Sequence, residues 1–370
     1  AYQFDWSHEV VLINGVTVTI KVAHVRLCYS RMLFVRAYPR ETQEMVFDAH
    51  ARAFQAFGGV TRRGIYDNMR TAVDRVRRGK ERDVNARFAA MVSHILFEAE
   101  FCNPASGWEK GQVEKNVRDA RPRLWQQMPD FPDLAALNDW LERRCQDLWH
   151  ESPHGALPGS IADVLALERA ALMPLPSAFD GFVEQSKRVS PTCLVHLDRN
   201  RYSVPAEFAG RQVSLRAWAD RIAVVAEGKL IAEHPRCFSR ERLLLDPWHY
   251  LPVLERKPGA LRHGAPFQNW ALPVPVATVK ARLMQTPQGD RAFVEILQAL
   301  QEHGMEQVSV ACELALEHRT VTAPVILNHL HRLVSPLREV DQVSTALTLT
   351  TLPAANCQRY DSLLEVPRAH

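Results

Sequence analysis

The chain has 370 residues, of which 46% are hydrophobic, and carries a formal net charge of +3 at pH 7. Two or three domains are expected, because one hydrophobic core seldom organises more than about 250–300 residues. The seven cysteines are odd in number and form no CxxC pair. This disfavours a disulfide framework or a zinc finger and indicates a reduced, cytoplasmic setting. No run of about 18 apolar residues and no signal-peptide pattern occurs, so neither a membrane-spanning nor a secreted protein is expected.

The first forty or so residues carry the alternation typical of antiparallel strands. Residues 2–7 alternate aromatic with polar side chains, which places Asp5 on the face opposite the aromatic ones. An Asn-Gly turn, an alternating segment over 16–22 and a further strand over 32–37 complete a predicted three-stranded meander.

Helices and strands alternate over the next hundred residues. Helical spacing predicts helices over 42–57, 84–96 and 134–149, whereas 63–66 and 97–101 are predicted strands. The strand over 63–66 ends directly before Asp67. The predicted order is thus three strands, then a helix, a strand, a helix, a strand and two helices.

The stretch 62–87 is locally basic, with nine Arg or Lys residues against four acids. Its centre, from Arg75 to Asp83, has few apolar residues and is predicted to be a loop. The pattern leaves open whether Arg75, Arg77, Arg78, Lys80 and Arg82 contact a nucleic acid or only form a solvated linker.

The second half of the chain changes composition. A proline-rich connector with a short helix over 161–172 precedes five short predicted strands, which suggest a small β-barrel. Proline-interrupted sequence and four predicted helices follow, and the last thirty-odd residues lack clear periodicity, which fits either a flexible tail or a peptide that docks on a partner. The predicted divisions are 1–150, 151–189, 190–236, 237–335 and 336–370.

The segment 107–121 is predicted to start and form a helix with two stripes. One stripe is apolar, and the other holds a single carboxylate, Glu114, among the cations Lys110, Arg118 and Arg121. Taken alone, this pattern favours an ordinary ion pair between Glu114 and Arg118, four residues apart on a solvated helix.

Three carboxylates fall at related places: Asp5 inside the first strand, Asp67 at the end of a later strand, and Glu114 on the helix after the sheet. In a fold of this order the first and fourth strands are neighbours, so Asp5 and Asp67 could project to one site that Glu114 covers. Oxygen ligands of this kind suit Mg²⁺ or Mn²⁺. Two such ions about 3.5–4 Å apart can support an in-line displacement at phosphorus.

These segments resemble the three catalytic blocks of the retroviral-integrase superfamily: Asp5 in the first strand, the segment Gly64–Met69, and the segment Lys110–Val117. More closely, the chain is similar to IstA-type transposases of bacterial insertion sequences. The resemblance covers most of the chain. The 47 positions from Asp67 to Glu114 exceed the retroviral spacing but are unremarkable for this group of transposases.

The resemblance implies an α/β fold, with a ribonuclease-H-like mixed-sheet catalytic core over 1–150, a small DNA-binding β-barrel over 190–236 and a helical C-terminal region. Asp5, Asp67 and Glu114 would be the catalytic triad that binds two Mg²⁺ (or Mn²⁺) ions. The implied activity is that of a polynucleotidyl transferase, which cleaves the 3′ ends of the element and joins them to target DNA.

The implied partners are double-stranded DNA, further copies of the chain in a dimer or tetramer, and an AAA+ ATPase helper of the IstB type, in the bacterial cytoplasm and associated with DNA. Phosphate contacts from basic and polar residues would give affinity with little base specificity. The expected DNA-contacting residues are Arg63, Asn68, Arg70, Lys110, Lys115, Arg118 and Arg121.

Two alternatives stay open: a ribonuclease-H-like nuclease that only hydrolyses, and a DNA-binding regulator without catalysis. The chain has no GxxxxGK[ST] loop, so it is not itself a P-loop ATPase, and its fifteen scattered histidines favour structural roles. Family members carry helix-turn-helix modules before the core. Because the first residue here is Ala rather than Met and a strand is predicted almost at once, we expect that sequence upstream is missing.

Overall fold

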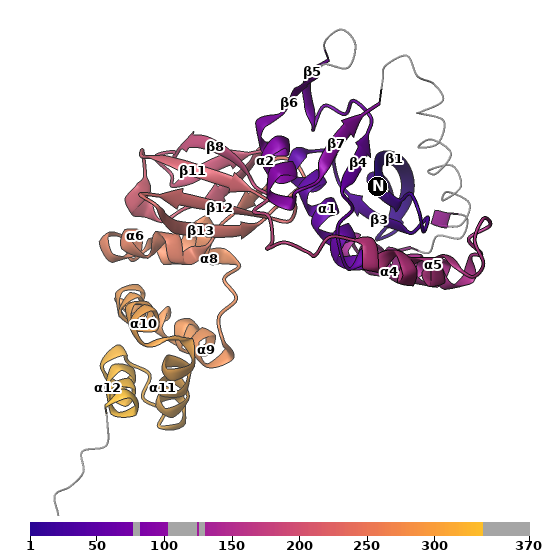
Figure 1. The fold of residues 1–370 in the computed structure, drawn as a ribbon. Helices are drawn as coiled ribbons and strands as arrows, with labels where there is room; N and C mark the ends of the chain where they lie inside the picture. The colour runs from indigo at the N-terminus through magenta and orange to yellow at the C-terminus, as the bar shows by residue number, and fades with distance from the viewer. Residues whose placement is uncertain (77–81, 103–123, 126–129, 336–370) are drawn as a thin grey trace, which may run out of the picture. The chain divides into compact units, whose positions relative to one another are not determined.

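The computed structural model describes residues 1–76, 82–102, 124–125 and 130–335 (Figure 1). The chain divides into two compact units, Ala1–Trp270 and a second unit that begins at Ala271. This division falls inside residues 237–335, which were predicted from the sequence to form one region. Within the described ranges, no helix combines the length and the apolar character needed to cross a membrane.

A five-stranded mixed sheet forms the centre of the first unit. Its strand order is β3-β2-β1-β4-β7. β1, β2 and β3 are antiparallel, whereas β4 and β7 run parallel to β1. This topology confirms the predicted ribonuclease-H-like α/β core and the predicted meander. The bounds are β1 Tyr2–Ile13, β2 Val16–Leu27, β3 Leu33–Tyr38, β4 Arg63–Tyr66 and β7 Glu98–Phe101.

The β1–β2 hairpin is longer than the sequence predicted, with twelve residues in each strand. The predicted turn joins the two strands, and Asn14 (φ 50°) and Gly15 (φ 72°) both adopt positive φ. Asn and Gly tolerate this conformation best, and a two-residue turn of this kind matches the twist of the flanking strands.

Helices pack against the sheet, as the sequence predicted. The described ones are α1 Gln43–Phe57, α2 Ala86–Ile95, α4 Leu134–Glu151 and α5 Ile161–Glu168, the last followed by a 3-10 turn, Arg169–Ala171. α1 ends where Gly58 takes a left-handed φ of 80°. Asn138 of α4 accepts a hydrogen bond from Ala37 N and donates one to Ala37 O, so its side chain satisfies the outer edge of β3.

The basic stretch that we predicted to be a loop contains a hairpin instead. β5 (Val73–Val76) pairs with β6 (Arg82–Val84) in antiparallel fashion, and Figure 1 shows both strands extending away from the five-stranded sheet. The loop prediction over 75–83 was wrong for these strand residues because strands of four and three residues that contain Arg75, Arg82 and Asp83 are too short and too charged to show hydrophobic alternation. Residues 77–81 lie outside the described residues.

Two small sheets follow the core in place of one closed barrel. A four-stranded sheet has the order β13-β12-β11-β8, a three-stranded sheet has the order β14-β10-β9, and no closed ladder joins them among the described residues. Both contribute to one hydrophobic core that includes Val195, Tyr202 and Leu215. The bounds are β8 Val183–Arg188, β9 Leu194–Leu197, β10 Asn200–Ser203, β11 Gln212–Ala217, β12 Arg221–Ala226, β13 Lys229–Pro235 and β14 Leu243–Leu244.

Helices complete both units. In the first, the 3-10 turns Ala206–Phe208 and Pro247–Tyr250 and the short helices α6 Leu251–Arg256, α7 Ala260–His263 and α8 Ala265–Gln268 accompany the small sheets. The second contains the four helices predicted from the sequence, and their apolar faces form its interior. They are α9 Val274–Leu283, α10 Gly289–His303, α11 Met305–Glu317 and α12 Ala323–Val334.

Candidate active site

The parallel pairing of β1 with β4 brings two of the predicted acidic residues to the same level of the sheet. The ladder pairs Tyr2 with Gly64 and Phe4 with Tyr66, an offset of 62 positions that also relates Asp5 to Asp67. Paired residues of neighbouring strands project to the same face of a sheet. The predicted neighbourhood of the first and fourth strands is therefore confirmed, and the same offset, carried one residue past the end of β4, aligns Asp67 with Asp5.

Each carboxylate is oriented by its own backbone. Asp5 Oδ1 accepts a hydrogen bond from the N–H of Trp6 at 2.8 Å, and Asp67 Oδ1 accepts one from the N–H of Asn68 at 2.7 Å. Both aspartates are half-buried. Because a carboxylate with a bonded oxygen loses rotational freedom, the fold holds both groups in defined directions before any ligand binds.

The third predicted carboxylate, Glu114, lies outside the described residues, and so do Lys110, Lys115, Arg118 and Arg121. Within the described ranges, no cluster of three or more His, Cys, Asp or Glu side chains could hold a metal ion. The described part of the candidate site therefore consists of Asp5 and Asp67, whose ligand roles stay a prediction.

The three predicted DNA-contacting residues that are described lie along β4 and just beyond it. Asn68 donates from Nδ2 to Cys102 O at 3.1 Å, which ties the end of β4 to the end of β7. Arg63 pairs with Glu100 at 3.4 Å and lies four residues before Asp67, about 13 Å away at roughly 3.3 Å per residue. Arg70 is exposed and three residues beyond Asp67.

A buried chain of hydrogen bonds supports the two strands from the opposite face. His50 of α1 lies with Nδ1 2.7 Å from Val46 O and with Nε2 2.8 Å from the hydroxyl of Tyr66. Because Nδ1 must donate to the carbonyl, Nε2 accepts from Tyr66, whose oxygen in turn accepts from the hydroxyl of Tyr2. Tyr2 and Tyr66 stand on β1 and β4, so this chain joins the strands that carry the aspartates.

Burial sets the protonation of this chain. Desolvation lowers the pKa of His50 to about 4 and raises the pKa of Tyr2 and of Tyr66 well above the usual value. All three groups are therefore neutral near pH 7. This cluster was not predicted from the sequence, although one signal was available: Tyr66 directly precedes Asp67, so alternation places its ring on the face opposite the carboxylate.

The β1–β4 pairing also depends on Gly64. A Cβ at this position would lie 2.6 Å from Tyr2 Cζ, closer than side chains approach one another. Gly64 therefore allows the ring of Tyr2 to lie across β4 and reach Tyr66.

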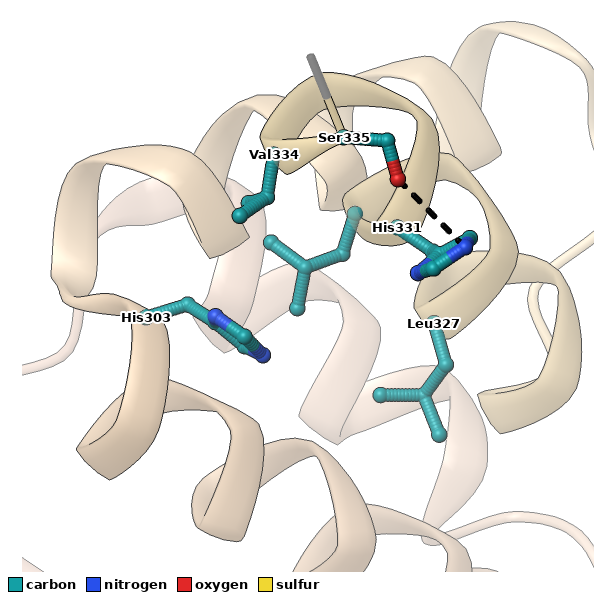
Figure 2. Close-up of a pocket in the computed structure, with 6 residues that line it drawn as sticks. His303, Leu327, His331, Val334 and Ser335 are labelled. Atoms are coloured by element: carbon teal, nitrogen blue, oxygen red, sulfur yellow. Dashed lines mark hydrogen bonds between the residues drawn. The ribbon is translucent and has the colours of Figure 1, made fainter.

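A separate cavity of about 420 Å³ lies in the second unit, at the ends of α10 and α12 (Figure 2). Its lining combines two imidazoles and one hydroxyl with apolar side chains, and Ser335 Oγ lies 3.4 Å from His331 Nε2. None of the predicted site residues lines this cavity. The lining residues are His303, Leu327, Leu330, His331, Val334 and Ser335.

The mixed sheet with the strand order β3-β2-β1-β4-β7 places the chain in the ribonuclease-H-like class of folds, which includes the retroviral-integrase catalytic cores. The match to a solved structure of the catalytic core domain of BIV integrase covers 46% of this chain and 95% of the integrase chain, with 15% sequence identity and a TM-score of 0.32. The strand order, rather than this weak likeness, defines the fold.

Relatives define the family more narrowly. The chain is 53% identical, over its whole length and 74% of the relative, to a transposase of Aminobacter aminovorans. It is also 53% identical to the transposase for insertion sequences IS1326/IS1353 of Pseudomonas aeruginosa, over 73% of that protein. Identity to the transposase of insertion sequence IS21 from the same species is 28%, over 69% of this chain and 65% of that protein.

Residues 175–246, which contain the two small sheets, match the family described as Mu transposase, C-terminal domain. The chain thus belongs to the transposases of bacterial insertion sequences, within the DDE-transposase and retroviral-integrase superfamily. The predicted resemblance is confirmed.

Proposed function

We propose that this transposase cleaves the ends of an insertion sequence to free 3′-hydroxyls and then joins them to target DNA, with Asp5, Asp67 and Glu114 as the catalytic carboxylates. The observation that supports this most is the parallel pairing of β1 with β4, in whose register Asp67, the residue directly after β4, aligns with Asp5. Two carboxylates at one level of a sheet, each oriented by a backbone N–H, suit a reaction that requires fixed negative ligands.

The chemistry of the donor set fits divalent metal. Asp5 and Asp67 provide hard oxygen ligands, and Glu114 completes the set, so these residues would hold Mg²⁺ or Mn²⁺, two ions per site. When bound, two such ions supply activation of the attacking oxygen and stabilisation of the leaving oxygen at phosphorus. The chain itself positions Asp5 and Asp67 through backbone hydrogen bonds, and Lys110, Lys115, Arg118 and Arg121 would provide cations for the DNA backbone.

The proposed partners follow from this reaction. Double-stranded DNA is the substrate, both as element end and as target, and two ends must be held together, so the active form is a dimer or a tetramer. We also propose that an AAA+ ATPase helper of the IstB type is a partner. The protein would act in the bacterial cytoplasm in association with DNA. We assign catalysis to residues 1–150 and DNA contact to the small sheets within 190–236, and residues 151–189 connect these two parts. The helical region 237–335 and the tail 336–370 are candidates for contacts with other subunits or with the ATPase.

A joining assay tests the proposal. The protein is incubated with a duplex that ends in a free 3′-hydroxyl, a supercoiled target plasmid and Mg²⁺, and covalent joining of the labelled duplex is measured on a gel. We expect a joined product when Mg²⁺ is present and none when EDTA chelates the metal. A nuclease would cut the DNA without joining it, and a regulator would bind without changing it; either result would contradict the proposal.

A further inference from the structure

A serine and a histidine form a buried pair on the face of the core sheet that carries Asp5. Ser7 of β1 and His24 of β2 are 5% and 4% exposed, and Ser7 Oγ lies 2.8 Å from His24 Nε2. Ser7 follows Asp5 by two positions along β1, so strand alternation places both side chains on one face. We call Ser7 and His24 the Ser–His pair.

The register of the β1–β2 hairpin places His24 directly opposite Asp5. Side chains at opposite positions of an antiparallel pair lie on the same face, with Cβ atoms about 4.5–5.5 Å apart. The contact with Ser7 shows independently that the ring of His24 lies on this face. The imidazole therefore stands beside the carboxylate of Asp5, and Ser7 holds the ring in place.

The neighbouring positions on this face of β2 are apolar. Ile20 and Val22 precede His24 at steps of two along the strand, and both side chains are buried. A hydrocarbon side chain at position 24 would continue this pattern, whereas a buried polar group costs free energy unless it is hydrogen-bonded. Of these three positions of β2, the polar one is the one opposite Asp5. Departures from core patterning of this kind are typical of functional sites.

The burial of the Ser–His pair fits a role in orienting Asp5. The carboxylate is half-buried, whereas the ring of His24 is buried and engages Ser7 through Nε2. One oxygen of Asp5 already accepts the N–H of Trp6, and a ring beside the carboxylate restricts its remaining rotation. A carboxylate that is restrained from two sides loses less freedom when it binds a ligand.

We infer that His24, held by Ser7, is a positioning residue that fixes the orientation of Asp5 and thereby raises the affinity of the candidate site for Mg²⁺ or Mn²⁺. This inference rests on the proposed function, in which Asp5 is a metal ligand, and it adds the Ser–His pair to the residues on which the site depends. Removing groups that orient metal ligands typically lowers metal affinity by about 10–100-fold.

Mn²⁺ binding in the absence of DNA tests the inference. His24→Leu replaces the imidazole by a hydrocarbon side chain, and Ser7→Ala removes only the hydroxyl. His249→Leu is the matched control, because His249 is also buried and its Nδ1 lies 2.8 Å from the hydroxyl of Ser203, in the small sheets. Free Mn²⁺ is measured by electron paramagnetic resonance during titration of each protein, after thermal melting has shown which variants fold.

Mn²⁺ should bind at least about tenfold more weakly to His24→Leu than to the wild type, and more weakly to Ser7→Ala as well. Because Ser7 acts through His24, the double variant should bind no more weakly than His24→Leu alone. His249→Leu should bind as the wild type does. Wild-type affinity in His24→Leu would overturn the inference, and so would an equal loss in His249→Leu. Should His24→Leu not fold, wild-type affinity in Ser7→Ala would overturn it.

The joining assay separates this inference from the proposed function. His24→Leu should need more Mg²⁺ for half-maximal joining and should approach the wild-type rate at saturating Mg²⁺, which a loss of folded protein would not allow. If the wild type yields no joined product while Mn²⁺ binding still depends on His24, the proposed reaction fails and this inference stands. If the wild type joins DNA and His24→Leu binds Mn²⁺ as it does, only this inference fails.

Discussion

Gly64 is the residue at which the smallest change should disturb the candidate site. Gly64→Ala would place a methyl group 2.6 Å from Tyr2 Cζ, so the ring of Tyr2 must move or the β1–β4 pairing must open. We expect a loss of about 1–3 kcal/mol in the free energy of unfolding, typical of overpacking. Urea unfolding measures it, and an unchanged midpoint and slope would show that the ring of Tyr2 is not held across β4.

His50 predicts a pH dependence of stability. Its pKa is about 4 in the folded protein and about 6.5 when unfolded, so the unfolded state binds more protons between these values. Stability from this group is complete above about pH 6.5 and falls as the pH drops toward 4, by about 3 kcal/mol in total. Urea unfolding at pH 7 and pH 5 should show a larger loss for the wild type than for His50→Gln. Equal losses would contradict the buried, neutral imidazole.

At the residue scale, the sequence predicted the placement of Asp5 and Asp67 because strand alternation is a local signal and the order of elements along the chain indicated that the first and fourth strands are neighbours. It did not predict the cluster of His50, Tyr66 and Tyr2, because that cluster depends on which residues of α1 meet the sheet, and spacing along the chain does not determine this. Glu114 stays a prediction, supported by the motif in which it stands.

At the scale of elements, the ion pairs around Arg236 connect α1 to the small sheets. Arg236→Met would leave Glu44, which is 6% exposed, without its partner, and a broken buried pair costs about 3–5 kcal/mol. Arg221→Met is the matched control, because the Arg221–Glu233 pair is about half exposed and such a pair contributes at most about 1 kcal/mol. Similar losses in thermal or urea unfolding for the two variants would refute a structural role of the buried pair.

The elements that the sequence missed share a physical cause. β8 alternates between half-buried and exposed positions, with charged or polar side chains at five of its six residues, and β14 has only two residues. β8 falls within the predicted linker 151–189 and supplies the outer strand of the four-stranded sheet. An edge strand has a neighbouring strand on only one side and can expose one face to solvent, so its sequence can show little hydrophobic alternation. Long amphipathic helices such as α10 and α12 lack this ambiguity and were predicted well.

At the scale of the whole molecule, the division after Trp270 predicts two cooperative units. The four helices α9 to α12 enclose buried apolar residues of their own, among them Phe293, Leu297 and Ile326. A fragment of residues 271–335 should therefore be helical by circular dichroism and unfold in one thermal transition. A fragment without helical signal would show that this unit depends on the rest of the chain.

The proposed active site depends most on Asp67 as a catalytic ligand beside Asp5. The most direct measurement compares Asp67→Asn with Asp139→Asn, an exposed aspartate of α4, for joining of a pre-cleaved end and for DNA binding in the same samples. Asp67→Asn keeps the size of the side chain and removes its charge, so joining should fall by at least about a hundredfold while DNA binding and folding persist. Asp139→Asn should join DNA as the wild type does. Joining by Asp67→Asn at a substantial fraction of the wild-type rate would contradict the proposed active site.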